Sequence, residues 1–152
     1  MAGISNRGKY LILGSAFQAT ASPSGFYVAL CTSASVPGAS KNVITELAEI
    51  ASGNGYTTGG ASVTRSSAGF DTLTEDDSAS NAYARIIDVV WTATGGNLPS
   101  SGNGARYAVL LDANVTASLR QVIAWFDLSS DRTVSDTQTL TLQDMELRLT
   151  ES

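Results

Sequence analysis

The segment Tyr83–Leu128 contains three apolar runs, 83-YARIIDVVW-91, 106-RYAVLL-111 and 121-QVIAWFDL-128. The runs are rich in Val, Ile, Tyr and Trp, which suit a pleated and half-buried surface. They are separated by 95-GGNLPSSGNG-104 and 112-DAN-114, two stretches of residues that favour turns and loops. The pattern predicts three strands at the centre of an antiparallel sheet, with the rest of the chain as neighbours and cover.

The N-terminal region predicts a short helix over residues 5–18, with Ser5 or Asn6 as its capping residue. Two glycines inside this segment lower its helix propensity, so a strand is the alternative. Three apolar side chains recur at helical spacing and are expected to dock on the sheet: Tyr10, Leu13 and Phe17.

Further strands are predicted on both sides of the central segment. Residues 42–50 are read either as a two-turn helical segment or as an irregular loop. The predicted strands cover residues 26–31, an edge strand at 61–65, a short strand at 69–73 and a final strand at 138–149. In that final strand Leu140 and Leu142 have the opposite parity to Met145 and Leu147, which one regular strand does not allow. We expect a β-bulge at Gln143-Asp144, or else two separate strands.

Together these elements predict an all-β fold, an antiparallel β-sandwich of jelly-roll type with a short N-terminal helix. The 152 residues form one domain, in which residues 1–20 are the N-terminal arm or helix. The central strands are apolar on both faces, so the helix and loops cover the second face or another subunit does. The predicted core consists of Val28, Leu30, Ile87, Val89, Trp91, Val109, Val122, Phe126 and Leu147.

The charge pattern argues against nucleic acid and membrane as partners. The net charge is −5, and the nine basic residues are spread along the chain rather than clustered. No apolar run approaches the about 20 residues that span a bilayer, and the N-terminus lacks the layout of a signal peptide. We therefore expect a protein that folds in a cytoplasm, with its one cysteine, Cys31, as a buried and inert thiol.

The residue types also argue against catalysis and bound cofactors. The chain has no histidine, which removes Ser-His-Asp and Cys-His catalysis and zinc sites that contain histidine. The acidic run Glu75–Asp77 offers hard oxygen ligands for calcium but lacks the EF-hand pattern, and a solvated loop is the simpler interpretation. Asp88, Asp112 and Asp127 lie near strand ends. Either the three carboxylates converge in space and hydrolyse a glycoside, or each of them serves a turn. We predict a protein that is not an enzyme and binds no cofactor or metal.

Several short motifs, taken in order, resemble a known group of proteins. The motifs are Gly8-Lys9-Tyr10-Leu11, Tyr27–Leu30, Gly53–Tyr56, Trp91–Ala93, Asp112-Ala113 and Asp136-Thr137 with the strand that follows. With them the chain is similar to small virion structural proteins of tailed bacteriophages, and the resemblance covers most of its length. Such proteins look like β-sandwiches and are assigned to capsid decoration or to tail parts, without catalytic residues.

The resemblance implies a capsid decoration (cement) protein in the virion, assembled in the host cytoplasm. Its expected partners are the major capsid protein and further copies of itself; a tail, baseplate or fibre component, with tail proteins as partners, is the alternative. A carbohydrate-binding module on the same fold is a second alternative, because sandwiches carry unrelated functions. The N-terminal segment and the glycine-rich loop 95–104 are the expected assembly contacts, with candidate residues Gly3, Ile4, Asn6, Arg7, Lys9, Asn97, Leu98, Pro99 and Asn103.

Overall fold

The computed structural model describes residues 2–150, which form ten strands, one α-helix and two short 3-10 helices. The first half of the chain contains β1 (Ala2–Ile4), α1 (Asn6–Phe17), β2 (Gly25–Cys31), η1 (Ile44–Glu46), β3 (Ala61–Thr64) and β4 (Phe70–Asp76). The second half contains β5 (Asn81–Ile86), β6 (Val89–Thr92), β7 (Ala105–Asp112), η2 (Ala117–Leu119), β8 (Val122–Arg132), β9 (Thr139–Leu142) and β10 (Met145–Thr150).

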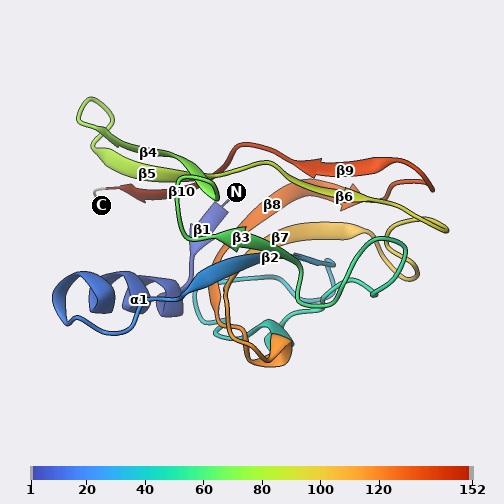
Figure 1. Cartoon of the computed structure of the whole chain (residues 1–152), viewed down its shortest axis with the longest axis horizontal. Helices are drawn as coiled ribbons and strands as arrows, with labels where there is room; N and C mark the ends of the chain where they lie inside the picture. Colours follow the sequence, from blue (N-terminus) through green and yellow to red (C-terminus); the bar gives the residue numbers. More distant parts are fainter. Residues whose placement is uncertain (1, 151–152) are drawn as a thin grey trace.

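The largest sheet has five strands in the order β1-β8-β7-β2-β3, and all of its pairings are antiparallel. Strands β7 and β8 contain the second and third apolar runs and lie inside this sheet, as expected. The prediction that the first run lies beside them in the same sheet is wrong. The run forms β5 and β6, which belong to the opposite layer in Figure 1, because it pairs with the C-terminal strands β10 and β9.

The opposite layer consists of a three-stranded sheet, β10-β5-β4, and a two-stranded sheet, β6-β9. Ile86 pairs with Met145, and Val89 pairs with Leu142, so two residues lie between these pairs on each strand. Asp144 there has a positive φ of 53°. Because both strands are interrupted together, the parity change has the second expected explanation, two separate strands, and the predicted bulge with one extra residue is not formed.

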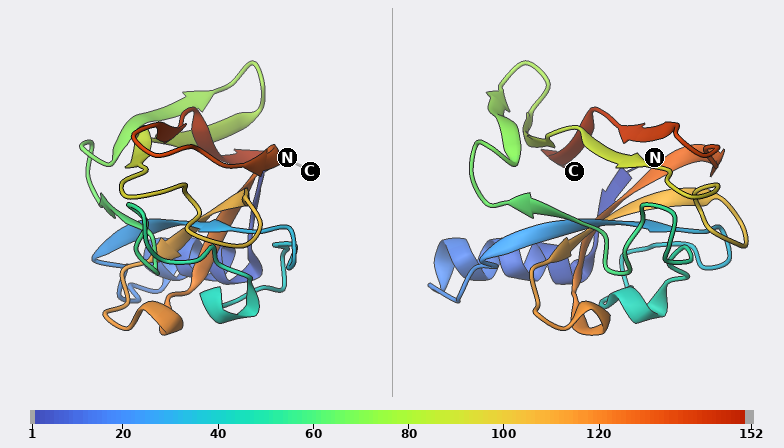
Figure 2. Two further views of the ribbon diagram at one scale, coloured as in Figure 1. Left: turned by 90° about the vertical axis from the view of Figure 1, so that its right-hand side faces the viewer. Right: turned by 45° about the vertical axis from the view of Figure 1, so that its right-hand side comes forward.

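The main hydrophobic core lies between the two layers, which the views in Figure 2 show one above the other. Leu30 and Leu110 contribute to it from the five-stranded sheet, and Ile86 and Trp91 contribute from the opposite layer. The predicted core residues are buried except Ile87 and Leu147, which are half-buried. Leu147 packs at the margin of the core from β10.

A second cluster covers the other face of the five-stranded sheet. Val109, Leu111 and Val122 pack there against Ile44 and Leu47, which come from the connection between β2 and β3. This connection contains only one 3-10 turn, η1, in place of the predicted two-turn segment. The chain therefore covers its own second face, which is the first of the two explanations for the doubly apolar strands.

The all-β class, the antiparallel sheets and the short N-terminal helix that the sequence predicts are confirmed. The sandwich and its jelly-roll form stay predictions, because two separate small sheets make up the opposite layer. Within residues 2–150 no helix is long and apolar enough to cross a membrane.

Candidate assembly surface

Helix α1 is attached to strand β8 through its first turn. The Ser5 hydroxyl accepts a hydrogen bond from the Gly8 N–H at 2.9 Å, which caps the helix as the sequence predicts. The same hydroxyl donates to the Val122 carbonyl at 2.5 Å, and the Ser5 N–H donates to the Ile123 carbonyl. A β carbon at Gly8 would collide with that Ile123 carbonyl. The helix therefore approaches β8 with a glycine, and it does so more closely than a larger residue permits.

The apolar face of α1 points to solvent. Tyr10, Leu13 and Phe17 are 54%, 56% and 81% exposed, so the prediction that they dock on the sheet is wrong. The buried residues of the helix are the two glycines, and Leu11 packs at the margin of the core. The reason is geometric: because the glycine side docks closely on β8, the larger side chains are turned outward. In Figure 1 the helix projects past the ends of the strands.

A small apolar cavity of about 150 Å³ lies on the side of α1 that faces the strands. Leu11 and Ile12 line it from α1, and Phe26 and Phe70 line it from β2 and β4. The two phenylalanine rings meet edge to face with centroids 5.2 Å apart. We call the exposed side chains of Tyr10, Leu13 and Phe17, which share one side of the helix, the α1 apolar face. Apolar side chains grouped on an exposed face are typical of interaction sites.

The predicted N-terminal contacts lie next to this face but differ in exposure. Asn6 and Lys9 are exposed, as a contact requires, and Arg7 is half-buried. The Arg7 side chain donates to Gln121 Oε1 at 2.5 Å and its guanidinium lies 4.8 Å from the Tyr10 ring centre.

The residues before the helix belong to the sheet rather than to a free arm. Gly3 and Ile4 form part of β1, which the sequence did not predict, and they pair with Trp125 and Ala124 of β8. Gly3 lies so close to the Trp125 ring that a β carbon would clash with it.

The predicted contact residues in the loop 95–104 differ in exposure. Leu98 and Pro99 are buried, and Leu98 is fully inaccessible within the main core. The Leu98 backbone exchanges two hydrogen bonds of 2.9 Å with Val134. Asn97 and Asn103 remain exposed. The candidate residues Leu98 and Pro99 are therefore corrected to core residues, because the loop folds inward and is tied by its backbone.

The three strand-end aspartates each have their own hydrogen-bond partners. Asp88 accepts from the Gln143 amide at 3.0 Å, and Asp112 accepts from the Gln121 N–H at 2.7 Å. Asp127 binds Arg106 at 2.9 Å and also accepts from Ser129 N–H, and these contacts hold the pKa of its carboxyl below the usual range. The contacts of Asp88 and Asp127 join neighbouring segments that are distant in sequence, and Asp127 also accepts locally from Ser129.

The acidic run Glu75–Asp77 lies at the tip of the β4–β5 hairpin. Asp76 accepts hydrogen bonds from the Ser78 hydroxyl and the Ala79 N–H, which hold its pKa below the usual range. Glu75 and Asp76 belong to β4, so most of the acidic run lies in a strand and not in the predicted loop. Among the residues that the structure describes, no group of three acidic, histidine or cysteine side chains could hold a metal ion.

The single cysteine lies in the core behind a buried tyrosine. Cys31 is fully buried, as the sequence predicts. Burial raises the pKa of its thiol, and the negative charge of the nearby Glu49 carboxylate raises it further. The Tyr56 hydroxyl donates to Glu49 at 2.6 Å and accepts from the Leu30 N–H at 3.0 Å. Burial, followed by Glu49, also raises the pKa of Tyr56. These groups brace the turn before β3 against β2.

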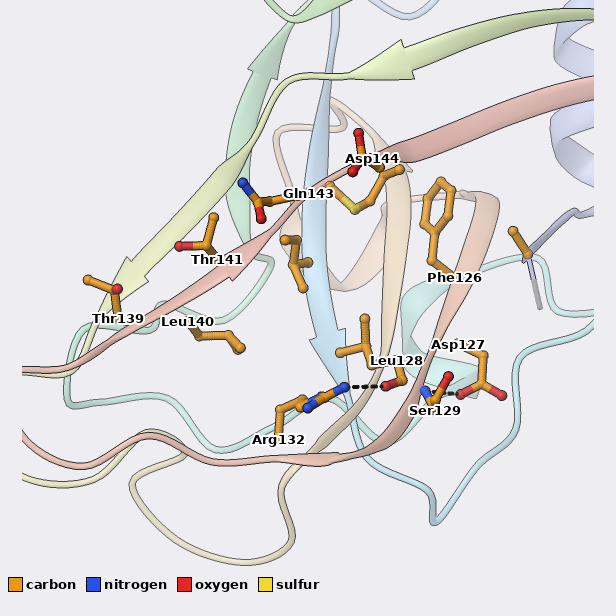
Figure 3. A pocket seen from close by; sticks show the side chains of 13 residues that line it. Phe126, Asp127, Leu128, Ser129, Arg132, Thr139, Leu140, Thr141, Gln143 and Asp144 are labelled. Carbon is orange, nitrogen blue, oxygen red and sulfur yellow. Dashed lines mark hydrogen bonds between the residues drawn. The ribbon is translucent and has the colours of Figure 1, made fainter.

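A cleft of about 630 Å³ lies between the end of β8 and strand β9 (Figure 3). Thr139, Leu140 and Thr141 line one side of it, and Leu128 and Arg132 line the other. Arg132 donates to the Leu128 carbonyl at 3.0 Å at the rim.

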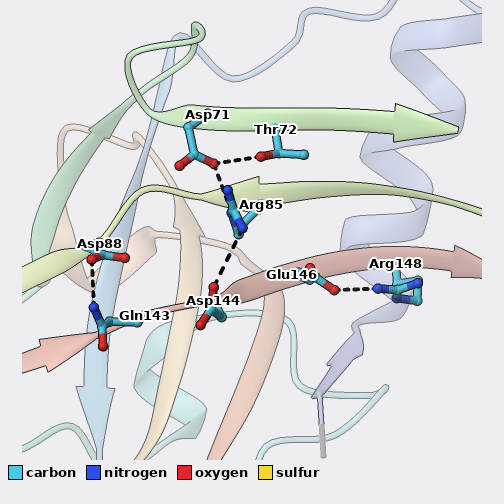
Figure 4. Close-up of polar contacts among 8 residues, drawn as sticks. All are labelled: Asp71, Thr72, Arg85, Asp88, Gln143, Asp144, Glu146 and Arg148. Atoms are coloured by element: carbon cyan, nitrogen blue, oxygen red, sulfur yellow. Dashed lines mark hydrogen bonds and ion pairs between the residues drawn. The ribbon is translucent and has the colours of Figure 1, made fainter.

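The outer face of the three-stranded sheet carries a chain of polar contacts, shown in Figure 4. Arg85 on β5 binds Asp71 on β4 at 3.1 Å and reaches Asp144 at 3.7 Å. The Arg85 guanidinium holds the pKa of the Asp71 carboxyl below its usual range. Arg148 on β10 binds Glu146 at 2.5 Å. This face is charged and solvated, which leaves the α1 apolar face as the strongest candidate for assembly.

The sequence placed α1 correctly and misjudged which side of it docks. The available signal was Gly8, a small residue next to the capping Ser5, which permits close approach to another backbone. A comparison of the chain with known protein families, with curated proteins and with solved structures finds no match.

Proposed function

We propose that this chain is a structural protein of a bacteriophage particle, a capsid decoration (cement) protein that binds the major capsid protein on the outer surface. It acts as a homo-oligomer and without catalysis. The motif resemblance to small virion proteins supports the phage assignment. The observation that carries the mode of action is the α1 apolar face, with Leu13 and Phe17 more than half exposed.

The α1 apolar face suits a contact that is rigid and apolar. Ser5 and Gly8 fix the helix to β8 through backbone contacts, so the helix is held before any partner arrives. Burying a Leu or Phe side chain contributes about 1.5–3 kcal/mol. A contact of three such side chains is modest in one copy, and it becomes strong when many copies bind one shell. Bridging neighbouring capsid subunits in this way would prevent any one of them from moving outward alone.

The experiment is to delete the gene from the phage that encodes the chain, purify the particles and heat them. Loss of a cement protein should lower the temperature at which the particles release DNA, and re-addition of the purified protein should restore it. Electron microscopy of complete particles should show density for the chain on the capsid surface. Unchanged heat stability, together with density only on the tail, would reject the cement function and leave the tail alternative.

A further inference from the structure

The cleft between β8 and β9 has the geometry of a missing strand. Its apolar floor consists of residues from both layers: Phe126, Leu128, Leu140, Leu142 and Met145. Strand β9 pairs with β6 on one side only and is therefore an edge strand. The cleft follows the whole length of β9, whose four residues span about 13 Å at the rise of an antiparallel strand.

The backbone of β9 offers hydrogen-bonding groups to this cleft. Backbone N–H and C=O groups point to alternating sides of a strand. The Gln138 carbonyl accepts from the Ala93 N–H on the β6 side. Leu140 and Leu142 share that direction, so the backbone groups of Thr139 and Thr141 point the other way, into the cleft that these residues line.

Strand β9 also lacks the devices that protect an edge. Natural edge strands are blocked by charged residues, proline, bulges or a covering segment. The sequence of β9 is Thr139-Leu140-Thr141-Leu142, without charge or proline, and it pairs with β6 without a register shift. A strand of this kind is a ready template for another strand.

The cleft is one end of a seam that runs between β8 on one side and β9 and β10 on the other. Strand β1 fills the other end of this seam. Ala2–Ile4 pair with Ala124–Phe126 of β8 and lie beside β10. The space that remains there between β1 and β10 is only about 60 Å³, against about 630 Å³ between β8 and β9. Ala2 itself lines the near end of the large cleft. Strand β1 therefore fills one half of the seam. The other half continues in the direction of β1 and is open.

We propose that the cleft binds an extended arm of a partner protein, which adds as a strand to the free edge of β9 in line with β1. Such strand addition gains affinity from main-chain hydrogen bonds and specificity from alternate side chains. The inward side chains of the arm are apolar, because they meet Leu128, Leu142 and Met145. Its outward side chains lie beside Thr139 and Thr141, so polar β-forming residues suit those positions. This site is separate from the α1 apolar face.

The test uses the full chain and a capped heptapeptide of alternating threonine and valine. Two further peptides carry backbone N-methyl groups, one on the threonines and one on the valines, so that each lacks the donors on one side. Amide hydrogen exchange of Thr139 and Thr141 is measured by nuclear magnetic resonance during titration. The unmodified peptide should slow exchange of both amides at least tenfold at saturation. One N-methylated peptide should bind in the same way, and the other should have no effect.

A second version of the test removes the dependence on peptide affinity. The same heptapeptide is fused ahead of Met1 through a short glycine–serine spacer, which gives it a high effective concentration near the cleft. A control extension of the same length consists of glycine and serine only. Slower exchange at Thr139 and Thr141 in the fused peptide alone supports the proposal. Equal exchange rates in the two fusions, or equal binding of both N-methylated peptides, would overturn it, and either result leaves the proposal for α1 unaffected.

Discussion

In helix α1 and in the loop 95–104, the burial in the fold is the opposite of what the composition of the segment suggests. The helix carries apolar side chains at regular spacing, yet it exposes Leu13 and Phe17 and docks through Gly8. The loop is rich in glycine, serine and asparagine, yet it places Leu98 fully inside the core. The difference shows that close approach of the backbone, rather than apolar content, decides which segment is buried here.

The largest expected loss of stability comes from a substitution in the loop 95–104. Replacing a fully buried Leu by Ala removes apolar contacts and leaves a cavity, so Leu98→Ala should lower the free energy of unfolding by about 2–5 kcal/mol. Urea denaturation measures this change. The matched control is Asn97→Ala at the exposed neighbouring position, which should stay within about 0.5 kcal/mol of the wild type. Similar stabilities of the two variants would contradict the inward fold of the loop.

The next effect concerns the docking of the helix. Alanine raises helix propensity over glycine by about 1 kcal/mol, so Gly8→Ala would stabilise a helix that is free on this side. The β carbon would instead collide with the Ile123 carbonyl, and we expect a net loss of about 1–3 kcal/mol. Thermal unfolding gives the sign. Gly38→Ala is the control, because a β carbon there meets nothing within 4 Å. A Gly8→Ala protein more stable than the wild type would show that α1 does not approach β8 so closely.

A smaller effect on stability is expected on the exposed side of the helix. Leu13→Ser and Phe17→Ser remove apolar surface that already faces water, so each should change the free energy of unfolding by less than about 0.5 kcal/mol. Sedimentation velocity of the same variants should show loss of self-association. If either substitution unfolds the protein, the face is buried within the subunit and the assembly proposal loses its basis.

The smallest change in stability is expected on lowering the pH, because the titrating carboxylate lies on a strand and α1 has none. Arg106 holds the pKa of Asp127 on β8 below the range of the unfolded chain, whereas α1 contains no acidic residue. The carboxylate therefore stabilises the fold above the unfolded pKa of about 3.9, and this stabilisation is lost as the pH falls through the lower folded value. Urea midpoints between pH 5 and 2 should fall less steeply in Asp127→Asn than in the wild type. Identical slopes would show that this ion pair does not contribute.

The strands could be predicted from the sequence because β-branched and aromatic runs between turn residues have a strong local signature. The runs at 106–111 and 121–128 became the interior strands β7 and β8 for that reason. Strand β1 has no such signature, since three residues acquire strand geometry only by pairing with β8. The parity change at Gln143-Asp144 was visible, but its partner at Ile87-Asp88 depends on long-range pairing.

The candidate contacts were predicted less well, because exposure depends on tertiary packing. Asn6 and Lys9 were placed at the surface correctly, and Leu98 was not, since its burial requires the backbone pairing with Val134. The apolar pattern of α1 was recognised, while the direction in which it faces follows from the contact of Gly8 with a strand 115 residues away in sequence, at Ile123. Gly8 indicates a close approach, but no local pattern identifies the strand that it contacts.

The proposed binding to a phage capsid through the α1 apolar face can be measured directly. The direct test is to mix particles that lack the protein with purified wild type or with the Leu13→Ser, Phe17→Ser double variant, and to measure binding by co-sedimentation. We predict saturable binding of the wild type and loss of binding by the double variant, with both proteins equally stable in urea. Equal binding of the two proteins, or no binding of the wild type to the capsid, would contradict the proposal.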